Sequence, residues 1–355
     1  MRSRMAGGSH RGSFVWFAIV RISGYVTLQT EAPDLSPIQA PMKKIVRYCL
    51  QFWKEEFHAG LYLTLGVFLA LAIWANYEFG IKKILIDSRN KELTQIPAYL
   101  LFYGFPYLFA LFAWAYCTSN WSRLRQTGFW GYLLFALLLL SVKSWFYYHQ
   151  PLAILLFLQP AWIWGTELLW NMKSSLFYLV PLLGFWWIVD RKTMPSFYGL
   201  TKKNFEARPY FIILLAVAPL IVIASLQPDF MRSYPQYVPG SMEEALGWSP
   251  WVSTGLLQLF YGLDFTFVEL FFRGFVVIGM ARWLGPGAIL PMVAVYCFLH
   301  FGKPAGEAIA SVFGGYLLGI FVFYSRSILG GVILHWGVAW LMECSAYAQI
   351  LFSSD

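Results

Sequence analysis

The stretch VELFFRG, Val268–Gly274, places a carboxylate and a guanidinium inside an apolar run of the chain. Glu269 and Arg273 are four residues apart, so on a helix they share one face and can form an ion pair. Among the twelve residues before this stretch Asp264 carries the single charge, and the six residues after it carry none. If the helix spans a bilayer, the pair lies at membrane depth, where ionisable side chains are energetically expensive and mark candidate functional sites.

The composition of the whole chain identifies an integral membrane protein. Of its 355 residues, 59% are hydrophobic and only 12% are charged, whereas soluble domains have about 25% charged residues. The net charge of +8 does not indicate nucleic acid as a partner, because Lys and Arg occur in short groups between apolar runs and form no basic face. We therefore assign these cations to contacts with the lipid bilayer and to membrane topology.

The apolar runs predict an all-α fold, a polytopic transmembrane bundle of about nine spans with a range of eight to ten, because a helix needs ~20 apolar residues to cross a bilayer. The segment 151–170 is apolar but contains Pro160 and Glu167, so it is either a tenth span or a re-entrant or interfacial piece. With nine spans and a cytoplasmic amino terminus, thirteen Lys and Arg residues fall inside and seven outside, which favours that topology. The predicted spans are 58–77, 96–117, 128–147, 174–190, 209–226, 253–281, 287–301, 305–325 and 327–350.

Three regions follow from the distribution of these runs. Residues 1–41 predict a disordered or spurious amino-terminal extension, with Met42 as a natural start; a signal peptide is the other interpretation, although no small-residue cleavage site follows its apolar patch. Residues 227–252, which contain Pro, Gly and an acidic pair, form the longest later stretch without a span. We interpret this stretch as the linker between an amino-terminal transmembrane half, 42–245, and a carboxy-terminal transmembrane core, 246–355.

Three further polar residues lie at membrane depth in the carboxy-terminal half, namely His300, Glu307 and His335. Two helices joined by a tight turn bring to one depth the residues that are equidistant from the turn. One turn signal containing Gly and Pro lies midway between Glu269 and His300, and another lies midway between His300 and Glu307. These three residues are therefore expected to be level, whereas straight helices would leave His335 about 15 Å from Glu307 in depth.

The order and spacing of these residues resemble the signature of the CAAX prenyl protease 2 and bacteriocin-processing (CPBP) family of intramembrane proteases. The motifs of that family are Glu-Glu-x-x-x-Arg, Phe-x-x-x-His and His-x-x-x-Asn/Asp. They correspond here to the segment ending at Arg273, to the segment ending at His300 and to the segment beginning at His335. The resemblance covers roughly residues 250–345 and leaves out the amino-terminal half.

The chain departs from the family pattern at three positions. Val268 occupies the place of the first glutamate, which is usually given the catalytic role, Tyr296 replaces the aromatic Phe, and Ala339 replaces the final Asn or Asp. The segment HFGKPAGE, which ends at Glu307, instead resembles a bacterial branch of the family with the motifs Glu-Phe-Phe-Phe-Arg-Gly and His-x-Gly-Lys-Pro-x-x-Glu. In that branch a single glutamate in the first motif is the pattern, and the resemblance implies location in a bacterial inner (cytoplasmic) membrane.

The function implied by the resemblance is that of an intramembrane endopeptidase without a cofactor. Its substrate would be a membrane-anchored or lipid-modified (CAAX-like) peptide or protein, or a leader peptide. Glu269 or Glu307 would polarise the attacking water, His300 would help to position it, and His335 would donate to the developing oxyanion. Arg273 would hold Glu269 ionised and oriented, which favours Glu307 as the base.

Alternative interpretations of the same residues remain open. The protein is alternatively a non-catalytic pseudoprotease that binds a partner in the membrane, and a transporter is a third class, although no internal repeat supports it. Glu269 and Arg273 are alternatively a buried ion pair that fixes helix packing. Glu307 is alternatively an acidic residue in the first turn of a helix, where the helix dipole favours it.

A metal site is the last alternative. Two histidines and a carboxylate can form a catalytic zinc site, but no His-Glu-x-x-His helix is present, and the resemblance implies a metal-independent glutamate mechanism. The four cysteines lie far apart without a Cys-x-x-Cys spacing. We expect free thiols and no metal-thiolate site.

Overall fold

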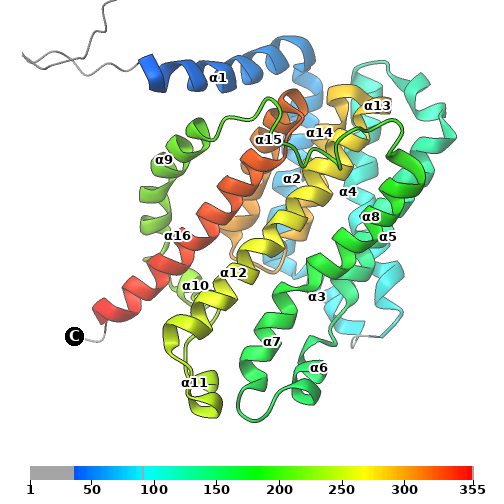
Figure 1. Cartoon of the computed structure of the whole chain (residues 1–355). Coiled ribbons are helices and arrows are strands. Elements are labelled where there is room, and N and C mark those ends of the chain that lie inside the picture. The colour runs from blue at the N-terminus through cyan, green and yellow to red at the C-terminus, as the bar shows by residue number, and fades with distance from the viewer. Residues whose placement is uncertain (1–35, 90–91, 354–355) are drawn as a thin grey trace, which may run out of the picture. The chain divides into compact units, whose positions relative to one another are not determined.

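The apolar runs of the sequence form a bundle of helices, and every one of the nine predicted spans coincides with a helical segment (Figure 1). The computed structural model describes residues 36–89 and 92–353. Residues 1–35 of the predicted extension 1–41 lie outside the described residues. The remainder of the extension, from Ser36, belongs to helix α1. The all-α membrane fold is thereby confirmed. The helices are α1 (Ser36–Glu56), α2 (Ala59–Phe79), α3 (Ile81–Leu85), α4 (Gln95–Cys117), α5 (Thr127–Trp145), α6 (His149–Leu156), α7 (Trp162–Asn171), α8 (Val180–Phe185), α9 (Arg208–Ala224), α10 (Pro228–Met231), α11 (Ser241–Leu246), α12 (Pro250–Glu269), α13 (Ala281–Leu284), α14 (Ile289–Leu299), α15 (Ala305–Ser325) and α16 (Leu329–Ser353).

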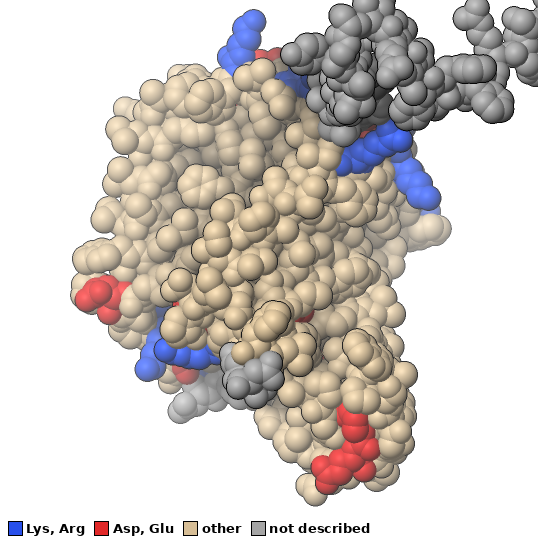
Figure 2. All heavy atoms as spheres, turned by 90° about the vertical axis from the view of Figure 1, so that its left-hand side faces the viewer, with Lys and Arg blue, Asp and Glu red and all other residues tan. Residues whose placement is uncertain are grey.

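Six helical segments of the described chain are long and apolar enough to cross a membrane by themselves, and α9 is a shorter apolar helix. Figure 2 shows a broad band free of Lys and Arg between an upper and a lower group of basic side chains. An apolar band between two charged ends is the surface expected of a protein that sits in a bilayer. The six segments are α2, α4, α5, the run Trp162–Asp190, α15 and residues Leu329–Phe352 of α16.

The ambiguous segment 151–170 is divided between two helices. α6 and α7 pack against each other as a short hairpin, and α7 then continues through α8 into one long helical run that ends at Asp190. The second half of the segment therefore belongs to the fourth span, and it does not form a tenth span.

Helix α1 lies across one end of the bundle in Figure 1. Its residues Ile45 and Phe52 are buried against the protein, whereas Leu50 and Trp53 are exposed and Arg47 lies among them in the sequence. A helix with one exposed apolar stripe beside basic residues is typical of the membrane interface. We interpret α1 as a helix that rests on the bilayer surface.

The centre of the bundle is formed by the two segments that carry the first two motifs. After Glu269, α12 continues as a π-helical segment, Leu270–Gly279, in which every residue is buried. α14 packs between α4 and α15 and is almost completely buried. Both segments are predominantly apolar, which is the pattern of a helix enclosed by other helices. Their polar residues are consequently held in the protein interior.

Candidate active site

The first motif lies where an α-helix passes into a π-helix. Glu269 is the last residue of α12 and Arg273 lies in the first π-helical turn, and both side chains are 0% exposed. The wider hydrogen-bonding pattern of a π-helix is rare and occurs often at functional sites. The α12 run therefore holds a carboxylate and a guanidinium in the core of the bundle.

The glycine that follows the motif fixes this helix against a loop. A Cβ atom on Gly274 would lie 2.5 Å from the carbonyl oxygen of Tyr198, so no larger residue fits without a shift. The Tyr198 hydroxyl donates to Asp190 at 2.7 Å, and Arg282 pairs with the same carboxylate at 2.6 Å. Asp190 thus holds both the loop that contains Tyr198 and the segment after the π-helix that contains Arg282.

Glu269 contacts the first and the third motif at the same time. Its Oε1 atom lies 3.0 Å from Arg273 Nη1, which confirms the ion pair that the spacing predicts. The same oxygen lies 3.0 Å from Nδ1 of His335, a residue 66 positions further along the chain. An ionised carboxylate only accepts hydrogen bonds, so Nδ1 of His335 is the donor and a neutral ring presents a lone pair at Nε2.

Tyr296 connects the second motif to both of these groups. The Arg273 guanidinium lies over its ring, 4.2 Å from the centroid, and its hydroxyl lies 3.4 Å from Nε2 of His335. Its carbonyl accepts a 2.8 Å hydrogen bond from Nδ1 of His300, whose ring packs edge-on against the tyrosine ring. Since a carbonyl only accepts, Nε2 of a neutral His300 also carries a lone pair. The sequence interpretation treated Tyr296 as a mild change of the aromatic residue and missed its hydroxyl.

Glu307 belongs to a neighbouring polar group. Its carboxylate accepts a 3.1 Å hydrogen bond from Tyr234 and pairs with Lys303 at 3.3 Å. The structure thus brings Glu269, Arg273, His335 and, through Tyr296, His300 into one cluster, whereas Glu307 has its polar contacts elsewhere among the described residues. Its side chain is 19% exposed, in contrast to the fully enclosed Glu269.

Several buried polar atoms of the cluster have no hydrogen-bond partner among the described residues. Oε2 of Glu269 and the nitrogens of Arg273 belong to this set. Nη1 of Arg273 is close enough to Glu269 for an ion pair, but its N–H is not aligned for a hydrogen bond, so the contact is one between charges. Leaving such atoms unpaired costs about 1–3 kcal/mol each. The cluster therefore contains polar atoms whose hydrogen-bonding capacity is not used by the described residues.

The carboxylate of Glu269 already has a cation of the chain as its partner. Arg273 places a positive charge 3.0 Å from the carboxylate oxygen that a cation would need. Within residues 36–89 and 92–353, no three His, Cys, Asp or Glu side chains are grouped as metal ligands. The donor set instead resembles a histidine that is oriented by a carboxylate.

Gly331 allows α16 to approach Glu269. It lies one turn before His335, and a Cβ atom on it would lie 2.2 Å from Oε2 of Glu269. The sequence signal for this contact is a glycine pair in an otherwise apolar span, four residues before the histidine and so on the same helix face.

Replacing Gly331 with alanine is expected to lower stability by about 1–3 kcal/mol, because the added methyl group overlaps the carboxylate and forces it away from His335. The measurement is the thermal unfolding midpoint of the purified protein in detergent. The matched control is Gly314→Ala on α15, where an added Cβ meets no atom within 4 Å. Equal midpoints for the two variants would contradict the close packing.

An α-helical membrane bundle whose buried core joins a carboxylate, a guanidinium and an imidazole has the features of an intramembrane enzyme. Residues 248–341 match the family model described as type II CAAX prenyl endopeptidase Rce1-like. The predicted family resemblance is thereby confirmed over this stretch, which includes all five predicted site residues. Searches of curated proteins and of solved structures give no significant match. The match supports a membrane protease of the CAAX type.

Proposed function

We propose that this protein is an intramembrane endopeptidase that uses a glutamate–histidine pair to activate water. The observation that carries this proposal is the 3.0 Å contact between Glu269 and His335, which joins the first and third motifs in the bundle interior. A carboxylate that accepts a hydrogen bond from Nδ1 of a histidine keeps the lone pair on Nε2, which can then act as a base. The side chain of His335 is 17% exposed while that of Glu269 is 0% exposed, so an entering water meets the imidazole first.

The residues of the cluster divide the steps of peptide hydrolysis among them. Nε2 of His335 takes a proton from water while the water oxygen attacks the peptide carbonyl carbon, and Glu269 stabilises the imidazolium that forms. His300 accepts the second hydrogen bond of the water at its own Nε2. When the C–N bond breaks, Nε2 of His335 returns the proton to the amine. The products are a carboxylic acid and an amine, and transfer of the acid proton to the amine then gives a carboxylate and an ammonium group.

Arg273 and Tyr296 are the candidate donors to the developing oxyanion. Arg273 pairs with the carboxylate of Glu269 and has N–H groups that find no hydrogen-bond partner among the described residues. The Tyr296 hydroxyl is held beside Nε2 of His335, next to the attacking water. Fixed donors in a dry pocket stabilise transition-state charge more strongly than water does.

The substrate that we propose is a membrane-anchored or lipid-modified peptide of the CAAX-like class, or a leader peptide. The name of the matching family supports this class, and a site enclosed by membrane helices restricts access to chains within the bilayer. We also place the protein in a bacterial inner membrane, as the resemblance of the segment from His300 to Glu307 implies. The rival function is a pseudoprotease scaffold that binds such a chain without cutting it.

Substrate profiling tests the proposal directly. Membranes that contain the wild-type protein are expected to yield cleaved peptides that are missing in a His335→Gln strain, because glutamine cannot accept and return the proton. New chain ends are identified by mass spectrometry of the membrane proteome. Identical peptide sets from the two strains would favour the scaffold. Cleavage by purified protein that stops after exhaustive chelation and returns with zinc would replace the glutamate mechanism with a metal mechanism.

A further inference from the structure

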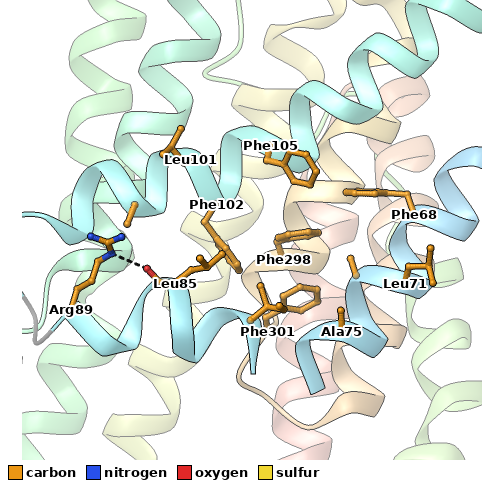
Figure 3. A pocket seen from close by; sticks show the side chains of 13 residues that line it. Phe68, Leu71, Ala75, Leu85, Arg89, Leu101, Phe102, Phe105, Phe298 and Phe301 are labelled. Atoms are coloured by element: carbon orange, nitrogen blue, oxygen red, sulfur yellow. Dashed lines mark hydrogen bonds between the residues drawn. The ribbon is translucent and has the colours of Figure 1, made fainter. Parts of the chain in front are cut away.

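A cavity of about 540 Å³ lies between α2 and α4. Its volume falls within the range of about 300–1,000 Å³ that is usual for ligand pockets. Side chains of α2, α3 and α4 form its walls, and Phe298 and Phe301 form its floor (Figure 3). None of the residues of the proposed mechanism lines it.

The lining of this cavity is apolar and stiff. Phe102 packs edge-on against Phe298 with ring centroids 5.2 Å apart, and Phe68 stacks above the same ring at 6.1 Å. Aromatic rings packed in this way keep a groove open and present a smooth apolar surface. The chemistry of the lining therefore fits an aliphatic chain and offers nothing to a polar ligand along most of its length.

The mouth of the cavity opens on the face of the protein that contacts lipid. Leu101, Phe105 and Leu71 border it and are 74%, 59% and 56% exposed. They belong to α2 and α4, both of which are long and apolar enough to span a membrane. Exposed apolar residues on spanning helices face the hydrocarbon of the bilayer. The molecules nearest to this opening are consequently membrane lipids.

One cation closes the far end of the groove. Arg89 is the single charged residue of the lining, and Figure 3 shows it at the end opposite Phe68 and Leu71. Among the described residues its recorded hydrogen bond runs from Nε to the carbonyl of Leu85 at 2.9 Å, which leaves the two terminal nitrogens of the guanidinium for another acceptor. Arginine binds phosphate with two parallel N–H donors.

The position of Arg89 also suits a lipid headgroup. It follows α3, a five-residue helix that begins after Gly80 and carries Lys82 and Lys83. Basic residues just beyond the end of a spanning helix lie at headgroup level, where they attract anionic lipids. The apolar groove and its terminal cation thus match the two parts of one amphiphile.

We propose that this groove binds one acyl chain of an anionic phospholipid of the bilayer, with the headgroup phosphate held by Arg89. The floor residues Phe298 and Phe301 flank His300 in the sequence. A bound chain therefore packs against the turn between α14 and α15 and stabilises it.

Lipid binding to the purified full-length protein tests this site. Native mass spectrometry with dioleoyl-phosphatidylglycerol and with dioleoyl-phosphatidylcholine compares an anionic with a zwitterionic headgroup on identical chains. We expect tighter binding of the anionic lipid and a higher unfolding midpoint in its presence. Arg89→Ala is expected to weaken binding of the anionic lipid about tenfold, because one charge-assisted contact is lost.

A second variant tests the chain-binding part. Ala75→Trp fills the groove and is expected to remove both the binding and the rise in the unfolding midpoint. The controls are Arg125→Ala, which removes an exposed arginine away from the groove, and Ala70→Trp, which adds the same ring to an exposed position of α2. Equal binding of the two lipids, or unchanged binding in both Arg89→Ala and Ala75→Trp, would overturn the proposal. So would an Ala75→Trp protein that retains phospholipid and loses only the cleavage of lipid-modified peptides, since the groove would then hold the substrate's own chain.

Discussion

Glu269→Gln is expected to abolish peptide cleavage, with turnover reduced by about 10²–10⁴-fold, the range for losing a positioned acid–base group. Glutamine has the same size as glutamate but no charge. It cannot stabilise the imidazolium of His335, and its amide NH₂ can face Nδ1 of the ring in place of an acceptor. The measurement is cleavage of a peptide found by substrate profiling, by purified protein in lipid nanodiscs.

Glu307→Gln, measured beside it, decides between the Glu269–His335 pair and Glu307 as the group that activates water. The sequence favours Glu307 as the base because Arg273 already engages Glu269, whereas the contacts with Tyr234 and Lys303 place Glu307 in a neighbouring polar group. We expect Glu307→Gln to retain a larger share of turnover than Glu269→Gln. If it loses as much or more, Glu307 is the base and the Glu269–His335 pair only supports it.

The control for both variants is Glu343→Gln. Glu343 is a buried glutamate of α16 that accepts hydrogen bonds from the backbone of Gln236 and the side chain of Gln258. It therefore tests the general effect of changing a buried carboxylate in this part of the bundle. Normal turnover by Glu343→Gln together with loss in Glu269→Gln assigns the loss to the site.

The positions of the helices could be predicted from the sequence because the bilayer imposes one length on every apolar run. The ion pair of Glu269 with Arg273 could also be predicted, since a spacing of four residues is a local property of a helix. The division of the segment 151–170 between two helices could not be predicted. A sequence that ends a helix and a sequence that only kinks a membrane-spanning helix have the same composition. Local rules thus located the elements and the first motif.

The contact between Glu269 and His335 depends on how the helices cross. The depth calculation assumed straight helices, whereas α12 continues after Glu269 as a π-helical segment of 10 residues. His335 reaches Glu269 because α16 packs against α12 and Gly331 removes the side chain between them. Close approach of this kind is set by tertiary packing, and one glycine in a sequence does not reveal its partner.

The buried position of the Glu269–Arg273 pair leads to the second large expected effect, a loss of stability in Arg273→Met. Methionine fills part of the same space but leaves the carboxylate of Glu269 buried beside His335 without its cation. Removing one partner of a buried pair costs about 3–5 kcal/mol, because the remaining charge is left uncompensated in a medium of low dielectric constant. We therefore expect a large drop in the thermal unfolding midpoint of the purified protein.

Lys303→Met is the matched control for this prediction. Lys303 and Glu307 form an ion pair with the same spacing of four residues, but their side chains are 46% and 19% exposed, against 0% for both members of the Glu269–Arg273 pair. Exposed pairs contribute about 0–1 kcal/mol, so the midpoint of Lys303→Met should stay close to that of the wild type. Adding Glu269→Gln to Arg273→Met should recover part of the lost stability, because it removes the uncompensated charge. If the double variant is no more stable than Arg273→Met alone, the lost stability comes from the packing of the guanidinium on Tyr296 and not from the buried charge.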